Sequence, residues 1–401
     1  MKRQSFILKF ISLALALSSV VAIGGCSDSG QAEVTGGGTN SPAVSDSTES
    51  SNGTQTDENT ELADITEAGT EAGEITEAVT DTAAPIGNDS FNADNIELVE
   101  GLINCVTYRR DGHWWGVQLY GGGYNRSLYV ESVNKFAEDL NGIAKVYSMV
   151  APTNSEFYCP PGYENINYSQ LDDISYIAEN LSSKVTNVDC YNVLKQHVND
   201  DIYFRTDHHW KVIGAYYAAE QFAKAADVPF AELNEENFEK KEIEGFIGSL
   251  YGTTGNENLR TDPDDFVYYV PANDFKCYYY DMAYNLDGRY PFFIPQDGKN
   301  AFGTFMGSDK KIVRAETDVK NGRKLMVIKD SYGNLEIPFY MNSFEEIYVT
   351  DVRFFDLNAI EFIKREGITD VLFTMCSASA TGQNCQGIEM MRTGAGHLID
   401  W

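Results

Sequence analysis

Four short apolar runs that alternate with helical stretches constrain the fold of this chain most. Each run is rich in β-branched and aromatic residues and is bounded by polar or turn residues, which is typical of buried strands. The predicted strands are Ala144–Ala151, Lys324–Ile328, Glu346–Val352 and Thr369–Thr374. The predicted helices are Tyr129–Leu140, Gln170–Leu181, Val212–Ala226 and Asn358–Glu366. This alternation favours an α/β fold with a mainly parallel sheet and helices on both faces.

One region interrupts the alternation. Glu244–Asp281 contains four glycines and then two aromatic runs, FVYYVP and FKCYYYDM. The glycines predict an irregular loop, and the two runs predict short antiparallel strands. We therefore expect a small irregular or β insertion over about residues 244–300. Its aromatic rings either pack the insertion itself or stack on sugar faces, and the sequence leaves both open.

Residues 1–25 have the pattern of an export signal. Lys2 and Arg3 precede an apolar run from Phe6 to Ile23, and a small-residue cleavage site ends at Cys26. The residues that follow are polar, which favours a cleaved signal peptide over a retained transmembrane helix. The site resembles the lipobox of bacterial lipoproteins. The resemblance implies that Cys26 carries a lipid and anchors the protein to the outer face of the cell membrane.

Residues 26–90 are expected to form a disordered linker. After Cys26 the segment is rich in Ser, Thr, Gly, Glu and Asp, and it has no Lys, Arg or aromatic residue before Phe91. Such a composition cannot bury enough apolar surface to offset the entropy of the chain. A coil of roughly 60 residues reaches on the order of 45 Å, which suits a tether. The remaining residues, 91–401, are ample for one large α/β domain.

The negative net charge of the chain argues against polyanionic partners. The formal net charge is −30, and the linker accounts for only part of it. Nucleic acid and anionic membrane surfaces are therefore poor partners.

Six cysteines besides Cys26 permit disulfides in an exported protein. Cys376 and Cys385 are the pair that we expect to be close enough to bond. Buried free thiols are the alternative. The absence of a C-x-x-C spacing argues against a zinc ribbon and a thioredoxin-type redox site.

A serine at the end of a predicted strand is the first candidate for chemistry. In KLMVIKDSYGNLEIP the strand runs into Asp330 and Ser331, and helix-compatible residues follow. Open α/β sheets bind ligands at the carboxyl ends of their strands. A serine needs an adjacent base to act as a nucleophile. Without a base, the same Asp-Ser turn would only cap a helix.

The stretch Thr206-Asp207-His208-His209-Trp210 could supply that base. A catalytic histidine needs a partner that fixes its tautomer and stabilises the imidazolium. In a turn that enters a helix, Asp207 is well placed for the side chain two residues on. His209 is therefore the better partner, and we expect His208 to face the other way in a supporting role. The structural alternative is that both histidines cap the helix and pack on Trp210.

A metal site is the other alternative for this stretch, because two adjacent histidines follow a carboxylate. It would need one or two more ligands. The remaining histidines, His113, His197 and His397, form no H-x-H or H-x-x-x-H pattern. We therefore expect neither a metal nor a cofactor.

Three segments resemble, in this order, the DHHW family of bacterial exported proteins: TDHHWKVIGAYYAAE, VIKDSYGNLEIPFY and IYVTDVRFFD. That family is related to the SGNH-hydrolase-like domains of the alginate O-acetylation proteins, and the resemblance covers most of Cys105 to Ser379. It implies a flavodoxin-like α/β/α sandwich of the SGNH type, with the histidine block upstream of the serine block in permuted order. It also implies that Ser331 is the nucleophile, His209 the base and Asp207 the orienting acid.

Two details of the resemblance concern the neighbours of this triad. SGNH enzymes usually space the acid and the base as D-x-x-H. Counted from Asp207, the position of the base in that spacing is Trp210 here. The D-x-H form of the alginate acetylation proteins instead selects His209. Relatives with proven chemistry usually have Gly-Asp-Ser at the nucleophile, whereas this chain has Lys329 before Asp330.

The backbone N–H of Ser331 is the first choice for an oxyanion donor, since N–H groups at the start of a helix point toward a charge that forms there. The N–H groups of Tyr332 and Gly333 are close by. Three further candidates follow predicted strands: Asn154, Ser377 and Ser379. Neither serine is the family's usual Asn, and ordinary loop capping would explain all three.

Two functions are consistent with these residues. The first is a cell-surface lipoprotein that acts on O-acyl, chiefly acetyl, esters of an extracellular or cell-wall glycan, as an O-acetyltransferase or an esterase. Its partners would be a glycan or acylated carbohydrate and a membrane protein that donates the acyl group. The second is a non-catalytic glycan-binding lipoprotein that retains the fold, which Lys329 and the aromatic insertion favour.

Overall fold

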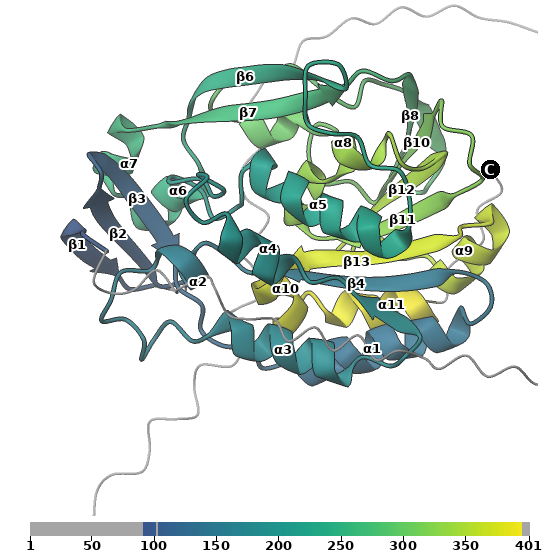
Figure 1. The fold of residues 1–401 in the computed structure, drawn as a ribbon, viewed down its shortest axis with the longest axis horizontal. Coiled ribbons are helices and arrows are strands. Elements are labelled where there is room, and N and C mark those ends of the chain that lie inside the picture. The colour runs from purple at the N-terminus through teal and green to yellow at the C-terminus, as the bar shows by residue number, and fades with distance from the viewer. Residues whose placement is uncertain (1–90, 102, 395–401) are drawn as a thin grey trace, which may run out of the picture. The chain divides into compact units, whose positions relative to one another are not determined.

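An eight-stranded sheet organises the fold in the computed structural model, which describes residues 91–101 and 103–394. In spatial order the strands are β5 (Val185–Asn187), β4 (Lys145–Ala151), β13 (Asp370–Cys376), β11 (Lys324–Lys329), β12 (Glu346–Asp351), β10 (Ile312–Thr317), β8 (Phe275–Tyr280) and β9 (Leu286–Arg289). The first five run parallel to one another. The last three continue the sheet with antiparallel pairing (Figure 1).

The predicted mainly parallel α/β sandwich is confirmed. The four predicted strands are present as β4, β11, β12 and β13. The four predicted helices are present, with small shifts at their ends, as α1 (Arg126–Asp139), α3 (Gln170–Asn180), α5 (Val212–Ala226) and α9 (Ala359–Glu366). The histidine block precedes α5 and the serine block follows β11, which is the permuted order that the resemblance implied.

Each central strand sends alternate side chains into two hydrophobic cores. In β11, Leu325 and Val327 belong to one core, and Met326 and Ile328 belong to the other. A strand that is covered on both faces is apolar at most positions. For this reason these strands could be recognised as continuous apolar runs in the sequence.

Helices supply the cover on both faces of the sheet. On one face lie α5, α4 (Cys190–Gln196) and α8 (Ile337–Tyr340). On the other lie α1, α3, α9 and α11 (Gln386–Thr393) (Figure 1).

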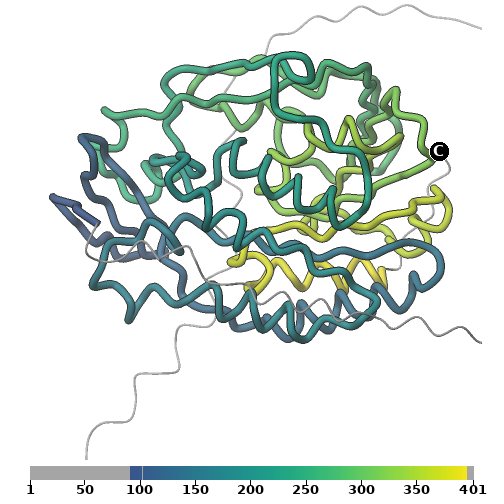
Figure 2. Tube along the Cα trace, viewed as in Figure 1, coloured from purple at the N-terminus to yellow at the C-terminus, as the bar shows by residue number. Residues whose placement is uncertain are grey.

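Strand β13, near the end of the described chain, completes the centre of the sheet. It lies between β4 and β11, and its pairing with β4 runs from Asp370–Lys145 to Cys376–Ala151. Figure 2 shows this late segment beside the early segments β4 and α1. The carboxyl ends of β4, β13 and β11 therefore meet at one edge of the sheet.

The predicted insertion does not form one separate unit. Strands β6 (Phe238–Phe246) and β7 (Asp264–Pro271) form a two-stranded antiparallel sheet of their own, with α6 (Ser249–Thr254) and α7 (Glu257–Thr261) between them. The run FKCYYY is instead β8, which pairs with β10 in the main sheet. Phe246 and Phe266 pack against Phe204, just before the histidine block. These rings of the insertion therefore pack the interior.

A small antiparallel sheet precedes the main fold in the chain. It consists of β1 (Asp94–Val99), β2 (Cys105–Arg110) and β3 (His113–Gln118). In β3, the N–H of Gly116 donates to the carbonyl oxygen of Arg205 at 2.8 Å. Helices α6 and α7 pack on the same strand. This sheet therefore abuts the segment that carries the histidine block.

All six cysteines of the described residues are unpaired, so Cys376 and Cys385, the most plausible pair, form no disulfide. The thiol of Cys376 lies 3.7 Å from the Ser379 hydroxyl, and that of Cys385 lies 3.2 Å from the carbonyl oxygen of Gly382. Five of the six thiols are buried, as the alternative prediction held.

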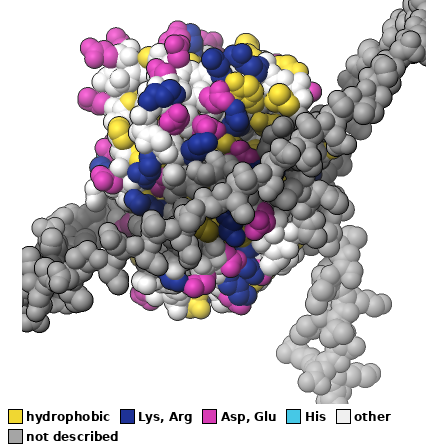
Figure 3. Space-filling model, turned by 90° about the vertical axis from the view of Figure 1, so that its right-hand side faces the viewer, with side chains coloured by type: hydrophobic (Ala, Val, Ile, Leu, Met, Phe, Trp, Pro, Cys, Tyr) yellow, Lys and Arg dark blue, Asp and Glu magenta, His cyan; other side chains and the backbone are white. Residues whose placement is uncertain are grey.

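The signal peptide, Cys26 and the linker lie outside the described residues. Within the described ranges, no helix combines the length and the hydropathy of a membrane span. Figure 3 shows acidic and basic side chains interspersed on one face of the molecule.

Candidate active site

Ser331 lies two residues after the end of β11. Asp330 caps the short 3-10 helix η3 (Ser331–Leu335), because its side chain accepts the N–H of Tyr332 at 2.9 Å. The other carboxylate oxygen of Asp330 accepts the N–H of Cys376, at the end of β13, at 3.1 Å. Asp330 therefore ties two neighbouring strand ends together and fixes the backbone on both sides of Ser331.

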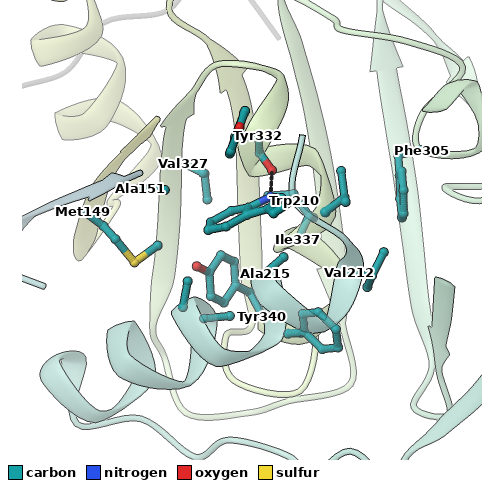
Figure 4. Packing of buried hydrophobic residues seen from close by; sticks show 14 of the residues in the cluster. Met149, Ala151, Trp210, Val212, Ala215, Phe305, Val327, Tyr332, Ile337 and Tyr340 are labelled. Atoms are coloured by element: carbon teal, nitrogen blue, oxygen red, sulfur yellow. Dashed lines mark hydrogen bonds between the residues drawn. The ribbon is translucent and has the colours of Figure 1, made fainter. Parts of the chain in front are cut away.

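Trp210 joins the histidine block to this serine turn. Its ring is fully buried, and its Nε1–H donates to the carbonyl oxygen of Tyr332 at 3.0 Å. Figure 4 shows the indole between Tyr332 and Ala215 of α5. A β-bridge between Tyr203 and Trp210 closes the loop that carries the histidines. The position that D-x-x-H spacing would give to the base is therefore a packing residue.

Asp207, His209 and Ser331 form a continuous hydrogen-bonded relay. Nδ1 of His209 lies 2.6 Å from Oδ1 of Asp207, and its Nε2 lies 2.7 Å from Oγ of Ser331. The acid and the imidazole are buried, and the serine is partly exposed. An orienting acid, a general base and a nucleophile need this order of contacts.

The carboxylate of Asp207 is held in its ionised form. Burial alone would raise its pKa, but the adjacent His209 and His208 and the hydrogen bonds from His209 and Ser249 hold the pKa well below its usual range. The Ser249 N–H donates to Oδ2 at 2.7 Å, and the His209 N–H donates to Oδ1 at 2.9 Å. An ionised carboxylate in this place stabilises a protonated His209.

The β6–β7 insertion clamps the histidine loop. Asp264, buried at the start of β7, accepts the N–H groups of Arg205 and Thr206 at 3.0 and 2.8 Å and the Thr206 hydroxyl at 2.8 Å. The N–H of Gly248 donates to the Thr206 hydroxyl at 3.1 Å. A Cβ at Gly248 would lie 2.2 Å from the Cβ of Asp207, so a side chain there would displace the acid.

Sequence reasoning did not identify the contacts of Gly248 and Asp264 with the histidine loop. It identified Gly248 only as one glycine of an irregular loop, and it did not single out Asp264. No spacing pattern connects an aspartate to the loop it supports more than fifty residues earlier in the chain.

The His208 ring packs against that of His209 at a tilt of 37°, so the expectation that it faces the other way is wrong. The ring centroids lie 3.9 Å apart. Nδ1 of His208 is 2.6 Å from the Ser249 hydroxyl and 3.6 Å from Oδ1 of Asp207. Burial and the neighbouring His209 lower the pKa of His208 to about 4. The ring is therefore neutral at physiological pH.

The side chains of Asp207, His208 and His209 lie close enough together to be considered as a metal site. Most of their ligand atoms already have partners. Asp207 accepts from His209 and from the Ser249 N–H, Nε2 of His209 contacts Ser331, and Nδ1 of His208 contacts Ser249 Oγ. A metal ion would have to displace several of these hydrogen bonds. The donor set fits a proton relay better than a metal centre.

Of the N–H groups expected at the oxyanion, that of Ser331 is available. Among the described residues it has no hydrogen-bond partner. The N–H of Tyr332 donates to the Asp330 carboxylate, and that of Gly333 donates to the Asp330 carbonyl at 3.2 Å. Both of these candidate donors are therefore engaged by Asp330.

The other three oxyanion candidates have partners of their own. The Ser377 hydroxyl donates to Gln170, and the Ser379 hydroxyl accepts from the Asn384 amide at 3.0 Å. The Asn154 amide donates to the Gly116 carbonyl at 3.2 Å, while its own Oδ1 is buried without a partner among the described residues. None of these three residues hydrogen-bonds to Ser331 in the described structure.

Lys329, in the place of the usual glycine, forms buried ion pairs. Its ammonium lies 3.1 Å from Asp351 and 3.2 Å from Asp309, and Arg353 contacts both carboxylates at 2.6 Å. Burial would lower the pKa of Lys329, but the two carboxylates raise it above its usual value. The lysine contacts this set of charges and not the relay.

Comparison with known proteins agrees with this architecture. A family model described as DHHW protein matches residues 123–350. A crystal structure of a DHHW family protein from Eubacterium siraeum is 46% identical, with a TM-score of 0.70 over 74% of this chain and 97% of that one. Bacillus cereus PatB1, solved with a sulfonyl adduct, is 15% identical, with a TM-score of 0.60 over 73% and 99% of the two chains. No curated protein matches the chain in sequence.

We predict that His208 stays neutral at a pH at which a free imidazole is protonated. The pKa of His208 is lowered to about 4, whereas an unfolded chain gives a histidine pKa of about 6.5. In isotopically labelled protein, the ring resonances of His208 should stay constant from neutral pH down to about pH 5. His208→Gln removes and so assigns these resonances.

The lowered pKa of His208 makes the stability of the folded protein depend on pH. Since the folded-state pKa lies below the unfolded one, protonation favours the unfolded chain. The contribution of His208 to the free energy of unfolding is therefore complete above about pH 6.5 and is lost as the pH falls toward about 4. Ring resonances of His208 that titrate near the unfolded pKa would contradict this account.

Proposed function

The chain belongs to the DHHW family, and on that premise we propose that it is a serine-dependent acyl-transfer enzyme. Its substrates are O-acyl, chiefly acetyl, esters of an extracellular or cell-wall glycan, on which it acts as an O-acetyltransferase or an esterase. One observation carries the proposal: the unbroken hydrogen bonds from Asp207 through His209 to Ser331.

Each member of the relay has a distinct task. Oγ of Ser331 attacks the ester carbonyl while Nε2 of His209 takes its proton. The free N–H of Ser331 donates to the oxyanion. The proton passes from His209 to the leaving alcohol, and the acyl group stays on Ser331. A sugar hydroxyl or water then gives its proton to His209, bonds to the acyl carbon and restores the serine.

No specific observation in the structure favours the non-catalytic alternative. The charge of Lys329 is balanced by the buried Asp351 and the partly exposed Asp309. Phe246 and Phe266 of the insertion pack in the interior behind the histidine loop. Lys329 therefore has a role in charge balance, Phe246 and Phe266 have a role in packing, and these three residues leave the relay intact.

We propose that the enzyme works outside the cytoplasmic membrane, held there by a lipid on Cys26 and lifted from the surface by residues 26–90. A membrane protein would supply the acyl group. A Cys26→Ala chain expressed in a lipoprotein-processing bacterium should move from the membrane fraction to the soluble fraction. Equal membrane retention of the wild type and the variant would contradict the lipid anchor.

Replacement of the serine tests the proposed function directly. Ser331→Ala should lower kcat/KM for an activated aryl acetate by at least about 10³-fold, and Asp207→Asn should cost up to about 10⁴-fold, since the base loses its orienting acid. Release of the aryl alcohol is the measurement. Ser127→Ala, at an exposed position of α1, is the matched control and should keep the wild-type rate.

Two outcomes would contradict the proposed catalytic role of Asp207, His209 and Ser331. One is a Ser331→Ala protein that is as active as the wild type. The other is loss of activity on treatment with a chelator, which would indicate metal chemistry at the Asp207–His208–His209 cluster instead.

Two glycines between β6 and β7 test whether the insertion holds Asp207 in place. Gly248→Ala should displace Asp207, because the new Cβ would lie 2.2 Å from the Cβ of the acid. A shift of about 1 Å in a catalytic group can cost roughly 10²-fold in kcat. Gly252→Ala adds its Cβ where no atom lies within 4 Å and should keep full activity. Thermal unfolding checks that both variants are folded, and a fully active Gly248→Ala enzyme would contradict the account.

A further inference from the structure

A second serine–histidine pair lies beside the relay and shares its carboxylate. Nδ1 of His208 is 2.6 Å from Oγ of Ser249 and 3.6 Å from Oδ1 of Asp207. The backbone N–H of Ser249 donates to the other oxygen of Asp207 at 2.7 Å. The pair is thus fixed in position by the acid of the relay, although neither residue hydrogen-bonds to Ser331 in the described part of the chain.

His208 has an unused polar atom. Its Nε2 has no hydrogen-bond partner among the described residues, and 31% of its side chain is exposed. The Asp207 carboxylate and the Ser249 oxygen both lie near Nδ1, which favours a proton on that nitrogen. This tautomer leaves a lone pair on Nε2, which can accept a hydrogen bond from a ligand.

The ring that carries this unused atom lies beside one of the reacting groups. The centroid of the His208 ring is 3.9 Å from that of His209, whose Nε2 contacts Ser331. In the second half of the proposed reaction, His209 must take a proton from the incoming hydroxyl. A compound with hydroxyl groups on adjacent carbons could place one hydroxyl at His209 and its neighbour at His208.

We propose that His208 and Ser249 form the binding site for the acyl acceptor, a vicinal diol such as a sugar or polyol. One acceptor hydroxyl donates to Nε2 of His208. Ser249, which accepts from Nδ1–H of His208, keeps its own proton to donate to another acceptor oxygen. The site rests on the proposed function, and it favours transfer to a hydroxyl over hydrolysis because it holds the acceptor where water would otherwise attack.

The transfer step balances without a further reactant. The bond between the acyl carbon and Oγ of Ser331 breaks, and a bond from the acceptor oxygen to the acyl carbon forms. The acceptor proton passes to Nε2 of His209 and then to Oγ of Ser331. His208 gains and loses no proton, so it is a positioning residue for the acceptor.

Asparagine and glutamine variants of His208 separate this role from a structural one. An Asn amide reaches the position of Nδ1 and can still bond to Ser249, but it leaves the Nε2 position empty. A Gln amide reaches the Nε2 position and gives up the contact with Ser249. If His208 binds the acceptor, Gln retains more function than Asn. If it only holds Ser249 in place, the order is reversed.

The measurement is the product ratio of the full chain with 4-nitrophenyl acetate as donor and glycerol as acceptor. The ratio of acetylglycerol to acetate does not depend on how fast Ser331 is acylated, so a slower variant still reports on the acceptor. We expect His208→Asn to lower the ratio by about tenfold, the effect of losing roughly one hydrogen bond. His208→Gln should lower it less, and Ser249→Ala should lower it as well.

Three outcomes would overturn the acceptor site: an unchanged ratio in His208→Asn, a higher ratio in His208→Asn than in His208→Gln, or a wild type that forms acetate but no acetylglycerol. Failure of the proposed function looks different. In that case, mass spectrometry of quenched wild-type protein would find no acetyl group on Ser331, and no product ratio would exist to compare.

Discussion

Two reciprocal hydrogen bonds between the histidine block and the serine turn hold the site together. The indole N–H of Trp210 donates to the carbonyl oxygen of Tyr332, and the Tyr332 hydroxyl donates to the carbonyl oxygen of His208. These residues are more than a hundred positions apart in the chain, and the first bond is buried while the second is partly buried. A buried polar group without its partner costs about 1–3 kcal/mol, so each bond disfavours separation of the two segments. The distance from His209 to Ser331 depends on this junction.

The insertion provides the second support for the site. Asp264 accepts three hydrogen bonds from Arg205 and Thr206, and burial raises the pKa of its carboxyl. Gly248 lies against Asp207 with no room for a side chain, and Ser249 follows it with bonds to both Asp207 and His208. The β6–β7 segment therefore belongs to the site as much as the central sheet does. The sheet positions the nucleophile, and the insertion positions the acid and the second imidazole.

The sequence predicted the parts of this arrangement that local patterns determine. The buried strands were recognisable because both of their faces are covered, and the two-residue spacing from Asp207 to His209 is local. Pairings between distant segments were not recognisable. An aromatic run such as FKCYYY does not reveal which sheet it joins, and the nearness of Cys376 to Cys385 in sequence does not fix the geometry that a disulfide needs. The position of His208 beside His209 involves a hydrogen bond to Ser249, which comes from the insertion.

The lysine before Asp330 shows how the fold accommodates a departure from Gly-Asp-Ser. Lys329 lies opposite Asp351 in the pairing of β11 with β12, and Asp309 and Arg353 complete a set of two positive and two negative charges. Removal of one member would leave a buried charge unpaired, which is far costlier than loss of a surface pair. Gly333 leaves room for the Lys329 side chain. A Cβ at Gly333 would lie only 2.6 Å from the Cβ of Lys329. The glycine two positions after Ser331 therefore supplies room that a glycine before Asp330 would otherwise provide, and the serine turn keeps its contact with His209.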